Sequence, residues 1–168
     1  MAETPLFNKA WEEAKVRIFR LEALPQYNAP EKGRKNFEEA GEWLNNLDKA
    51  KEKCLAIHRI RVFILPISDY LKYQIDLWKI SKNSGEQTLF LEEEKYKKTI
   101  EGLDFKPQDF WLFDDKLVII FHCDTKGNFL EEELVIEKEA VSKYVELRKK
   151  LMENSLSMTP FLYRVKRL

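Results

Sequence analysis

Three carboxylates flank the densest apolar run of the sequence. Asp109 precedes the run Phe-Trp-Leu-Phe, and Asp114 and Asp115 follow it directly. Carboxylates this close together could hold a divalent cation or act as a general acid and base, with Glu86 as a fourth acidic group. They could instead be structural, because aspartates are frequent in tight turns and at strand ends. The sequence leaves both interpretations open.

An arginine within an apolar strand pattern is the second candidate for chemistry. Arg61 alternates with apolar residues in the stretch 57–65, and Asp69 and Tyr70 begin the next predicted helix. A guanidinium beside a helix start could hold an anionic ligand, because arginines and helix N-termini both favour anions. It could also form a buried Arg–Asp pair that fixes the helix to the sheet. Both interpretations stay open at this point.

Several catalytic and cofactor-binding patterns do not occur in the sequence. There is no glycine-rich phosphate-binding loop and no Gly-x-Ser-x-Gly motif, and the chain has only five glycines. The two histidines, His58 and His122, and the two cysteines, Cys54 and Cys123, lack the spacing of metal ligands. We therefore predict no cofactor and no catalytic residue.

The charge balance argues against a nucleic-acid or membrane surface. The 29 basic and 29 acidic side chains give zero net charge, so no long-range field attracts polyanions. No apolar run approaches the roughly 20 residues of a membrane span, and the first residues lack the order of a signal peptide. We therefore predict a cytoplasmic protein that does not bind nucleic acid directly.

Hydrophobic periodicity predicts alternating helices and strands. Two apolar arms on either side of Asp114 and Asp115 predict a tight hairpin over 110–113 and 116–123, with the second arm buried on both faces. Residues 92–98 are so rich in charge that we expect a solvated turn or a single helical turn there. Further helices are predicted at 5–14, 31–41, 44–56, 69 to about 83 and 138–156, and further strands at 15–22, 57–65, 87–91 and 129–136.

This order of elements predicts an α/β fold. We expect a single domain over residues 1–168, with a mixed central sheet, helices packed on it and a long C-terminal helix. The strands over 58–65, 110–113 and 116–123 are expected at the centre of the sheet. The tail at 159–168 is basic and aromatic, and could dock on the body of the protein or on a partner.

Four blocks of sequence, read together, resemble a known pattern. They are Arg20-Leu21-Glu22 with Tyr27, Arg59-Ile60-Arg61-Val62 with Pro66 and Asp69-Tyr70, Gly85-Glu86, and Asp109-Phe110-Trp111-Leu112-Phe113-Asp114-Asp115. In this order they resemble an uncharacterised family of domains of unknown function, common in actinobacteria and often encoded beside helix-turn-helix regulators. The resemblance covers nearly the whole chain, although Gln74 stands where the family often carries an acid. It implies a regulatory or toxin–antitoxin-like context.

A more distant similarity concerns the order of elements around the Asp-Asp hairpin. This order is similar to one half of a phospholipase D-like domain. Those enzymes need a His-x-Lys motif, which does not occur here. The resemblance therefore implies a catalytically empty version that is used for binding.

Two functions from different classes follow from these patterns. The first is a non-enzymatic domain that binds a small anionic ligand or a protein partner such as a DNA-binding regulator. The second is a small metal-assisted hydrolase or nuclease, such as a toxin, that uses Asp109, Asp114 and Asp115 with Glu86. Because polar residues within apolar runs must find partners near the sheet, we expect one polar cluster to form the binding site. Its predicted members are Arg20, Glu22, Tyr27, Arg61, Asp69, Tyr70, Glu86, Asp109 and Trp111.

Overall fold

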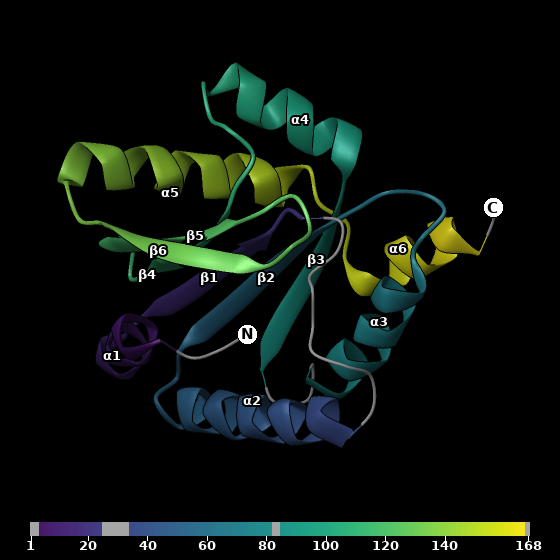
Figure 1. The fold of residues 1–168 in the computed structure, drawn as a ribbon, viewed down its shortest axis with the longest axis horizontal. Coiled ribbons are helices and arrows are strands. Elements are labelled where there is room, and N and C mark those ends of the chain that lie inside the picture. The colour runs from purple at the N-terminus through teal and green to yellow at the C-terminus, as the bar shows by residue number, and fades with distance from the viewer. Residues whose placement is uncertain (1–3, 25–33, 82–84, 167–168) are drawn as a thin grey trace.

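The computed structural model of the protein describes residues 4–24, 34–81 and 85–166, and Figure 1 shows how their helices and strands are arranged. These residues form one α/β domain, as the sequence predicts. None of its helices is long and apolar enough to cross a membrane. In chain order the elements are α1 (Pro5–Glu13), β1 (Arg17–Glu22), α2 (Arg34–Glu52), β2 (Ala56–Phe63), α3 (Asp69–Ser81), β3 (Glu86–Glu92), α4 (Glu93–Gly102), β4 (Asp109–Phe113), β5 (Leu117–Cys123), β6 (Phe129–Val135), α5 (Lys138–Glu153) and α6 (Met158–Val165).

The strands form one mixed sheet in the order β3-β2-β1-β4-β5-β6. β1, β2 and β3 run parallel to one another, whereas β4, β5 and β6 add antiparallel pairs. The three strands predicted at the centre, β2, β4 and β5, are all internal. β1 was not predicted at the centre, yet it lies between β2 and β4 in the middle of the sheet.

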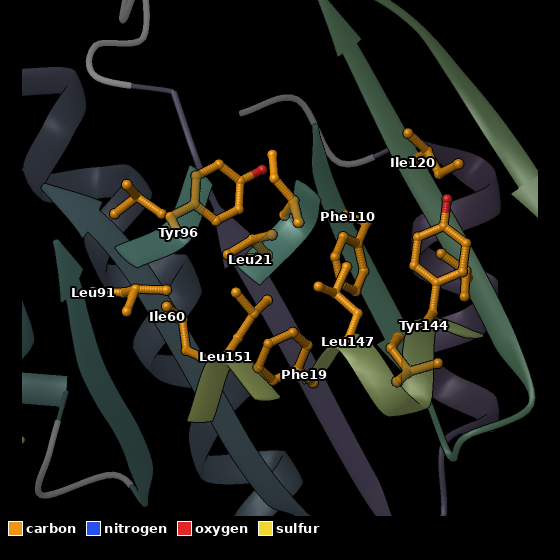
Figure 2. Packing of buried hydrophobic residues seen from close by; sticks show 14 of the residues in the cluster. Phe19, Leu21, Ile60, Leu91, Tyr96, Phe110, Ile120, Tyr144, Leu147 and Leu151 are labelled. Atoms are coloured by element: carbon orange, nitrogen blue, oxygen red, sulfur yellow. The ribbon is translucent and has the colours of Figure 1, made fainter. Parts of the chain in front are cut away.

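The sheet is covered by helices on both faces. Figure 1 shows α4 and α5 on one side and α1, α2 and α3 on the other. Side chains on a strand alternate between the two faces, so Ile60 and Val62 join the core under α4 and α5 while Phe63 packs on the opposite side. Figure 2 shows the first of these cores, where Leu147 and Leu151 of α5 pack onto the strands.

The predicted hairpin is confirmed, and its turn explains why two aspartates stand there. Asp114 and Asp115 have φ values of 51° and 59°, and the N–H of Lys116 donates to the carbonyl oxygen of Phe113 at 2.9 Å. The loop spans residues 114–116, and both aspartates in it have positive φ, a conformation that aspartate tolerates better than most residues. The interpretation of Asp114 and Asp115 as turn formers is therefore confirmed.

Three segments differ from the predictions. In the charged stretch 92–98, Glu92 ends β3 and residues 93–98 belong to the ten-residue helix α4, whose Tyr96 and Ile100 are buried on the sheet. The helices predicted at 31–41 and 44–56 form the single helix α2 over the residues that the structure describes, with Gly41 inside it. The tail predicted from residue 159 contains the helix α6, and its Phe161 is fully buried against the body of the protein.

Candidate functional site

Four charged side chains lie next to one another on the face of the sheet that α2 and α3 cover. Arg20 and Glu22 come from β1, and Arg59 and Arg61 come from β2. The parallel register places Arg20 beside Arg59 and Glu22 beside Arg61. Adjacent strands are separated by about 4.8 Å, so the four side chains form a compact array. With Glu86 at the start of β3 they make up a cluster that we call the arginine layer.

The arginine layer is held together by short ion pairs. The Oε1 atom of Glu22 accepts hydrogen bonds from Arg20 at 2.6 Å and from Arg59 at 2.7 Å. The Nε atom of Arg59 donates to Oε1 of Glu86 at 2.7 Å. Arg59 therefore bridges two buried carboxylates, which is the arrangement that offsets the cost of removing charges from water. The side chains of these four residues, Arg20, Glu22, Arg59 and Glu86, are between 1% and 12% exposed.

The charge of Glu22 is fixed by its surroundings. Burial raises the pKa of this carboxyl group, but Arg20, Arg59 and Arg61 lower it more strongly, and the net pKa is about 2 compared with an ordinary value of 4.5. A carboxylate with so low a pKa stays ionised at every physiological pH. Glu22 can therefore accept hydrogen bonds from the arginines but cannot exchange protons near neutrality.

Tryptophans surround the guanidinium groups. The guanidinium carbon of Arg20 lies 4.8 Å from the ring centre of Trp111, and that of Arg59 lies 5.2 Å from Trp43 and 6.0 Å from Trp78. These distances allow cation–π attraction, which strengthens when water is excluded. The tryptophans thus replace part of the hydration that the arginines lose.

Helix α3 brings uncharged polar groups to the same region. Tyr70 lies close enough to the layer that Glu22 and the arginines influence its hydroxyl, whose pKa is raised by burial and by Glu22 although the arginines oppose the rise. Gln74 donates to the hydroxyl oxygen of Tyr70 at 3.0 Å. Within the described part of the chain, buried Oε1 of Gln74 and buried Oγ1 of Thr88, the register partner of Arg59, have no hydrogen-bond partner. Buried polar atoms of this kind call for a partner.

The structure brings most of the predicted site residues together. Arg20, Glu22, Arg61, Glu86, Tyr70 and Trp111 belong to the arginine layer or contact it. Asp109 lies at the edge of this region, where its Oδ1 atom accepts the backbone N–H of Ala23 at 2.8 Å and so ties the end of β1 to β4. Tyr27 lies outside the residues that the structure describes.

Asp69 was predicted to be part of the cluster, and this prediction is wrong. Its side chain is 96% exposed at the start of α3 and forms an ion pair with Lys72 at 2.8 Å. Arg61 is only 1% exposed. A buried Arg61–Asp69 pair therefore does not fix α3 to the sheet.

Arg59 is the member that the sequence analysis did not include. Alternation along β2 places it on the same face as Arg61, and that signal was available in the Arg-x-Arg pattern. What the pattern does not reveal is that Arg59, and not Arg61, forms the ion pairs with both Glu22 and Glu86.

The three aspartates do not form a metal site. Asp109 and Asp114 lie at opposite ends of β4, roughly 15 Å apart along an extended chain. The carboxylate of Asp114 accepts the backbone N–H groups of residues 15–17 at 2.8–2.9 Å, and Asp115 pairs with Arg148. Burial, the largest single influence, raises the pKa of Asp114, but these three N–H groups and Lys116 together outweigh it, so the net pKa is lowered. Across residues 4–24, 34–81 and 85–166, no three acidic, histidine or cysteine side chains are grouped as metal ligands.

Comparison with known proteins places the chain in a family. The family model described as a domain of unknown function, DUF6879, matches residues 5–163. A search of the curated proteins found no match. The match covers the arginine layer, all six strands and nearly all of the six helices that the structure describes. The chain therefore belongs to the DUF6879 family of domains of unknown function.

Proposed function

We propose that this domain is a non-catalytic binding module that holds an anionic group of a small ligand or of a protein partner at the arginine layer. The observation that carries the proposal is the convergence of Arg20, Arg59 and Arg61 on one face of the sheet around a single carboxylate, Glu22. Guanidinium groups present planar pairs of N–H donors that match a carboxylate or a phosphate. Three of them beside a helix that carries Tyr70 suit the recognition of such a group.

Two members of this region give a ligand access to it. The side chain of Arg20 is 12% exposed, and Tyr70 is partly buried. Both therefore reach the surface, whereas Arg61 is buried. The hydroxyl of Tyr70 and the amide oxygen of Gln74 add a donor and an acceptor beside the guanidinium groups. A ligand with an anionic group next to a hydroxyl or an amide fits this chemistry.

The chemistry of the layer supports binding more than catalysis. General acid–base catalysis is most effective when the pKa of the catalytic group is near the working pH, and the pKa of Glu22 is about 2. The other groups of the layer are arginines, which do not lose their protons, and Glu86, which is paired with Arg59. None of the residues that form the layer is a serine, cysteine or histidine nucleophile.

The family resemblance extends the proposal to context. We propose a cytoplasmic, regulatory role, in which the domain works with a helix-turn-helix regulator or in a toxin–antitoxin-like module. The similarity to half of a phospholipase D-like domain without the His-x-Lys motif remains a prediction, and it agrees with a binding role. The metal-assisted hydrolase is not proposed, because its aspartates are far apart. Asp109 and Asp114 accept backbone N–H groups, and Asp115 forms an ion pair with Arg148.

The test is a thermal-shift titration with inorganic phosphate, citrate, nucleoside monophosphates and amino-acid carboxylates. A ligand at a hundredfold excess over its Kd stabilises the folded state by about 2.7 kcal/mol. For a domain of this size that corresponds to a rise in Tm of roughly 5–10 °C. We expect such a rise with at least one of these anions, and we expect Arg20→Gln and Arg61→Met to remove it.

Arg148 provides the matched control. It is 6% exposed and paired with a carboxylate, like the arginines of the layer, but it comes from α5 on the opposite face of the sheet. Arg148→Met should lower the Tm and leave the anion-dependent rise unchanged. If Arg61→Met fails to fold, the partly exposed Arg20→Gln still decides the question. Wild-type protein that no anion of the panel stabilises, or a rise that survives in Arg20→Gln, would overturn the proposal.

A further inference from the structure

The two edges of the sheet differ in whether other segments of the chain cover them. At the β3 edge, Phe90 and Leu156 exchange backbone hydrogen bonds of 2.8 and 2.7 Å, and Phe161 of α6 stacks on the ring of Phe90 at 3.8 Å. At the other edge, β6 pairs with β5 on its inner side, and the described residues place no strand on its outer side. An unpaired edge presents a row of backbone N–H and C=O groups to any extended chain.

The β6 edge also carries an unusual number of exposed apolar side chains. Four of the seven large hydrophobic side chains that are exposed in the described structure lie between residues 129 and 136. They are Phe129, Leu130, Leu134 and Ile136, with exposures of 45%, 62%, 42% and 60%. They form one group at each end of the strand, and exposed apolar groups on a sheet edge are typical of surfaces that bind other proteins.

The middle of the same strand is acidic. Glu131, Glu132 and Glu133 are consecutive and separate the two apolar ends of β6. Thr4 donates to Glu132 at 2.5 Å, and His122 lies 2.9 Å from Glu133. Within the described ranges 4–24, 34–81 and 85–166, the one ion pair of these three glutamates is with His122, and none is with a lysine or an arginine.

We propose that the outer edge of β6 is a docking site for an extended strand of a partner protein, with basic side chains at the centre of that strand and apolar side chains at its ends. Backbone pairing would supply affinity, and the side chains would supply specificity. Charge complementarity selects the basic partner, because three glutamates repel an acidic strand. This site is separate from the arginine layer and does not depend on the function proposed for it.

A second copy of this chain fits the edge poorly. Antiparallel pairing of β6 with itself over the whole strand places the glutamates of one copy opposite those of the other. With the symmetry axis at Glu132, for example, Glu131 of each copy faces Glu133 of the other. Like charges directly opposite each other destabilise a strand pair. The glutamates therefore disfavour self-association while they permit a basic strand.

The test uses two capped nine-residue peptides that differ only at their centre. Both carry alternating valine and threonine at the ends, and the central three residues are lysines in one and glutamates in the other. We expect the lysine peptide to bind, to weaken as salt is added, and to protect β6 amides from hydrogen exchange. The double variant E131K/E133K should bind it at least about tenfold more weakly, because each substitution replaces an attraction with a repulsion.

A control pair of substitutions separates docking from general charge attraction. Glu94 and Glu101 are exposed on α4, so E94K/E101K changes the net charge by the same amount at a distant place. This control should bind the lysine peptide as the wild type does. Equal weakening in both double variants, no change at the β6 amides with the lysine peptide, or a wild-type dimer that E131K/E133K separates into monomers would each overturn the proposal.

Discussion

Glu22 is the residue on which the arginine layer depends. It is 2% exposed, and its Oε1 atom accepts hydrogen bonds from two guanidinium groups. Removing one partner from a buried ionic network lowers the free energy of unfolding far more than replacing the whole network with apolar residues. The remaining charges then stay buried without an opposite charge. Loss of the carboxylate would leave Arg20, Arg59 and Arg61 to repel one another.

The first prediction concerns Glu22→Gln and its dependence on pH. In the folded protein the pKa of Glu22 is about 2, whereas the unfolded chain takes up the proton near 4.5. Between these pH values the unfolded state binds more protons, so the stabilisation is complete above pH 4.5 and is lost as the pH falls toward 2. We expect Glu22→Gln to lower the free energy of unfolding by about 3 kcal/mol at neutral pH. Urea unfolding from pH 2 to pH 7 measures this difference.

An exposed glutamate supplies the comparison for that experiment. Glu101→Gln on α4 should leave the pH dependence of the wild type in place. The difference in the free energy of unfolding between wild type and Glu22→Gln should become steadily smaller as the pH falls below 4.5. A gap that stays constant from pH 7 to pH 2 would show that the carboxylate gains nothing from the surrounding arginines.

At the level of single residues, the sequence was informative about which polar groups are buried but not about how they pair. Arg20, Glu22 and Glu86 stand in apolar strands, which forces them to find partners, and the prediction that they meet rested on this argument. Asp69 was misplaced because it stands at the first position of a helix, where a short polar side chain serves exposed caps as readily as buried pairs. Pairing depends on the register between β1, β2 and β3, which local sequence does not encode.

Among the elements, α6 shows how a short helix can be fixed by one side chain. Phe161 is fully buried, stacks on Phe90 and packs edge-on against Phe63 with ring centres 4.9 Å apart. The rest of the eight-residue helix is more exposed. A helix this short is not stable by itself in water, so its position depends on tertiary packing.

The second prediction compares two aromatic residues of α6. Phe161→Ala should lower the free energy of unfolding by about 3 to 5 kcal/mol, as expected when a buried ring is replaced by a methyl group. Tyr163 is 60% exposed on the same helix, and Tyr163→Ala should change stability by no more than about 0.5 kcal/mol. Denaturant melts of the two variants test this. Similar small losses in both would mean that α6 is not anchored through Phe161.

The helices that were not predicted correctly have few apolar residues or an internal glycine. In α4, Tyr96 and Ile100 are four residues apart on one face, but the other eight of its ten residues are polar or glycine. Two apolar positions on one stripe are too few to signal a helix by periodicity. In α2, Gly41 suggested an end because glycine costs about 1 kcal/mol within a helix, yet packing against the sheet carries the helix through it. Hairpin and strand signals, by contrast, were strong enough to be read from local pattern.

For the whole molecule, β1 is the strand that joins the parallel part of the sheet to its antiparallel part. It pairs with β2 on one side and with β4 on the other, and both of its faces contribute to buried cores. This central place is not evident from the sequence, because Arg17, Arg20 and Glu22 give β1 the pattern of a half-exposed strand. Arg17 is partly exposed, whereas the charges of Arg20 and Glu22 can lie within the domain because the arginine layer pairs them.

The third prediction is an order of hydrogen exchange across the sheet. Amides in β1 and β4 should exchange slowest, at rates near those set by global unfolding, because these strands are paired on both sides and covered on both faces. Amides of β6 should exchange fastest among the strands in the protein alone, since β6 is an edge strand. Native-state exchange followed by NMR measures this order. Protection of β6 equal to that of β1 in the isolated protein would contradict it.

The central place of β1 also has a consequence for synthesis on the ribosome. β1 is the first strand of the described chain to be made, but Ile18 pairs with Phe113, which is translated 95 residues later. Until β4 leaves the exit tunnel, a strand with five apolar or arginine side chains in its six positions has one open edge. Pairings between distant segments form slowly and expose nascent chains to aggregation. Early binding of β1 by a holding chaperone would therefore favour the yield of folded protein, whereas a pause in translation before residue 109 would lower it.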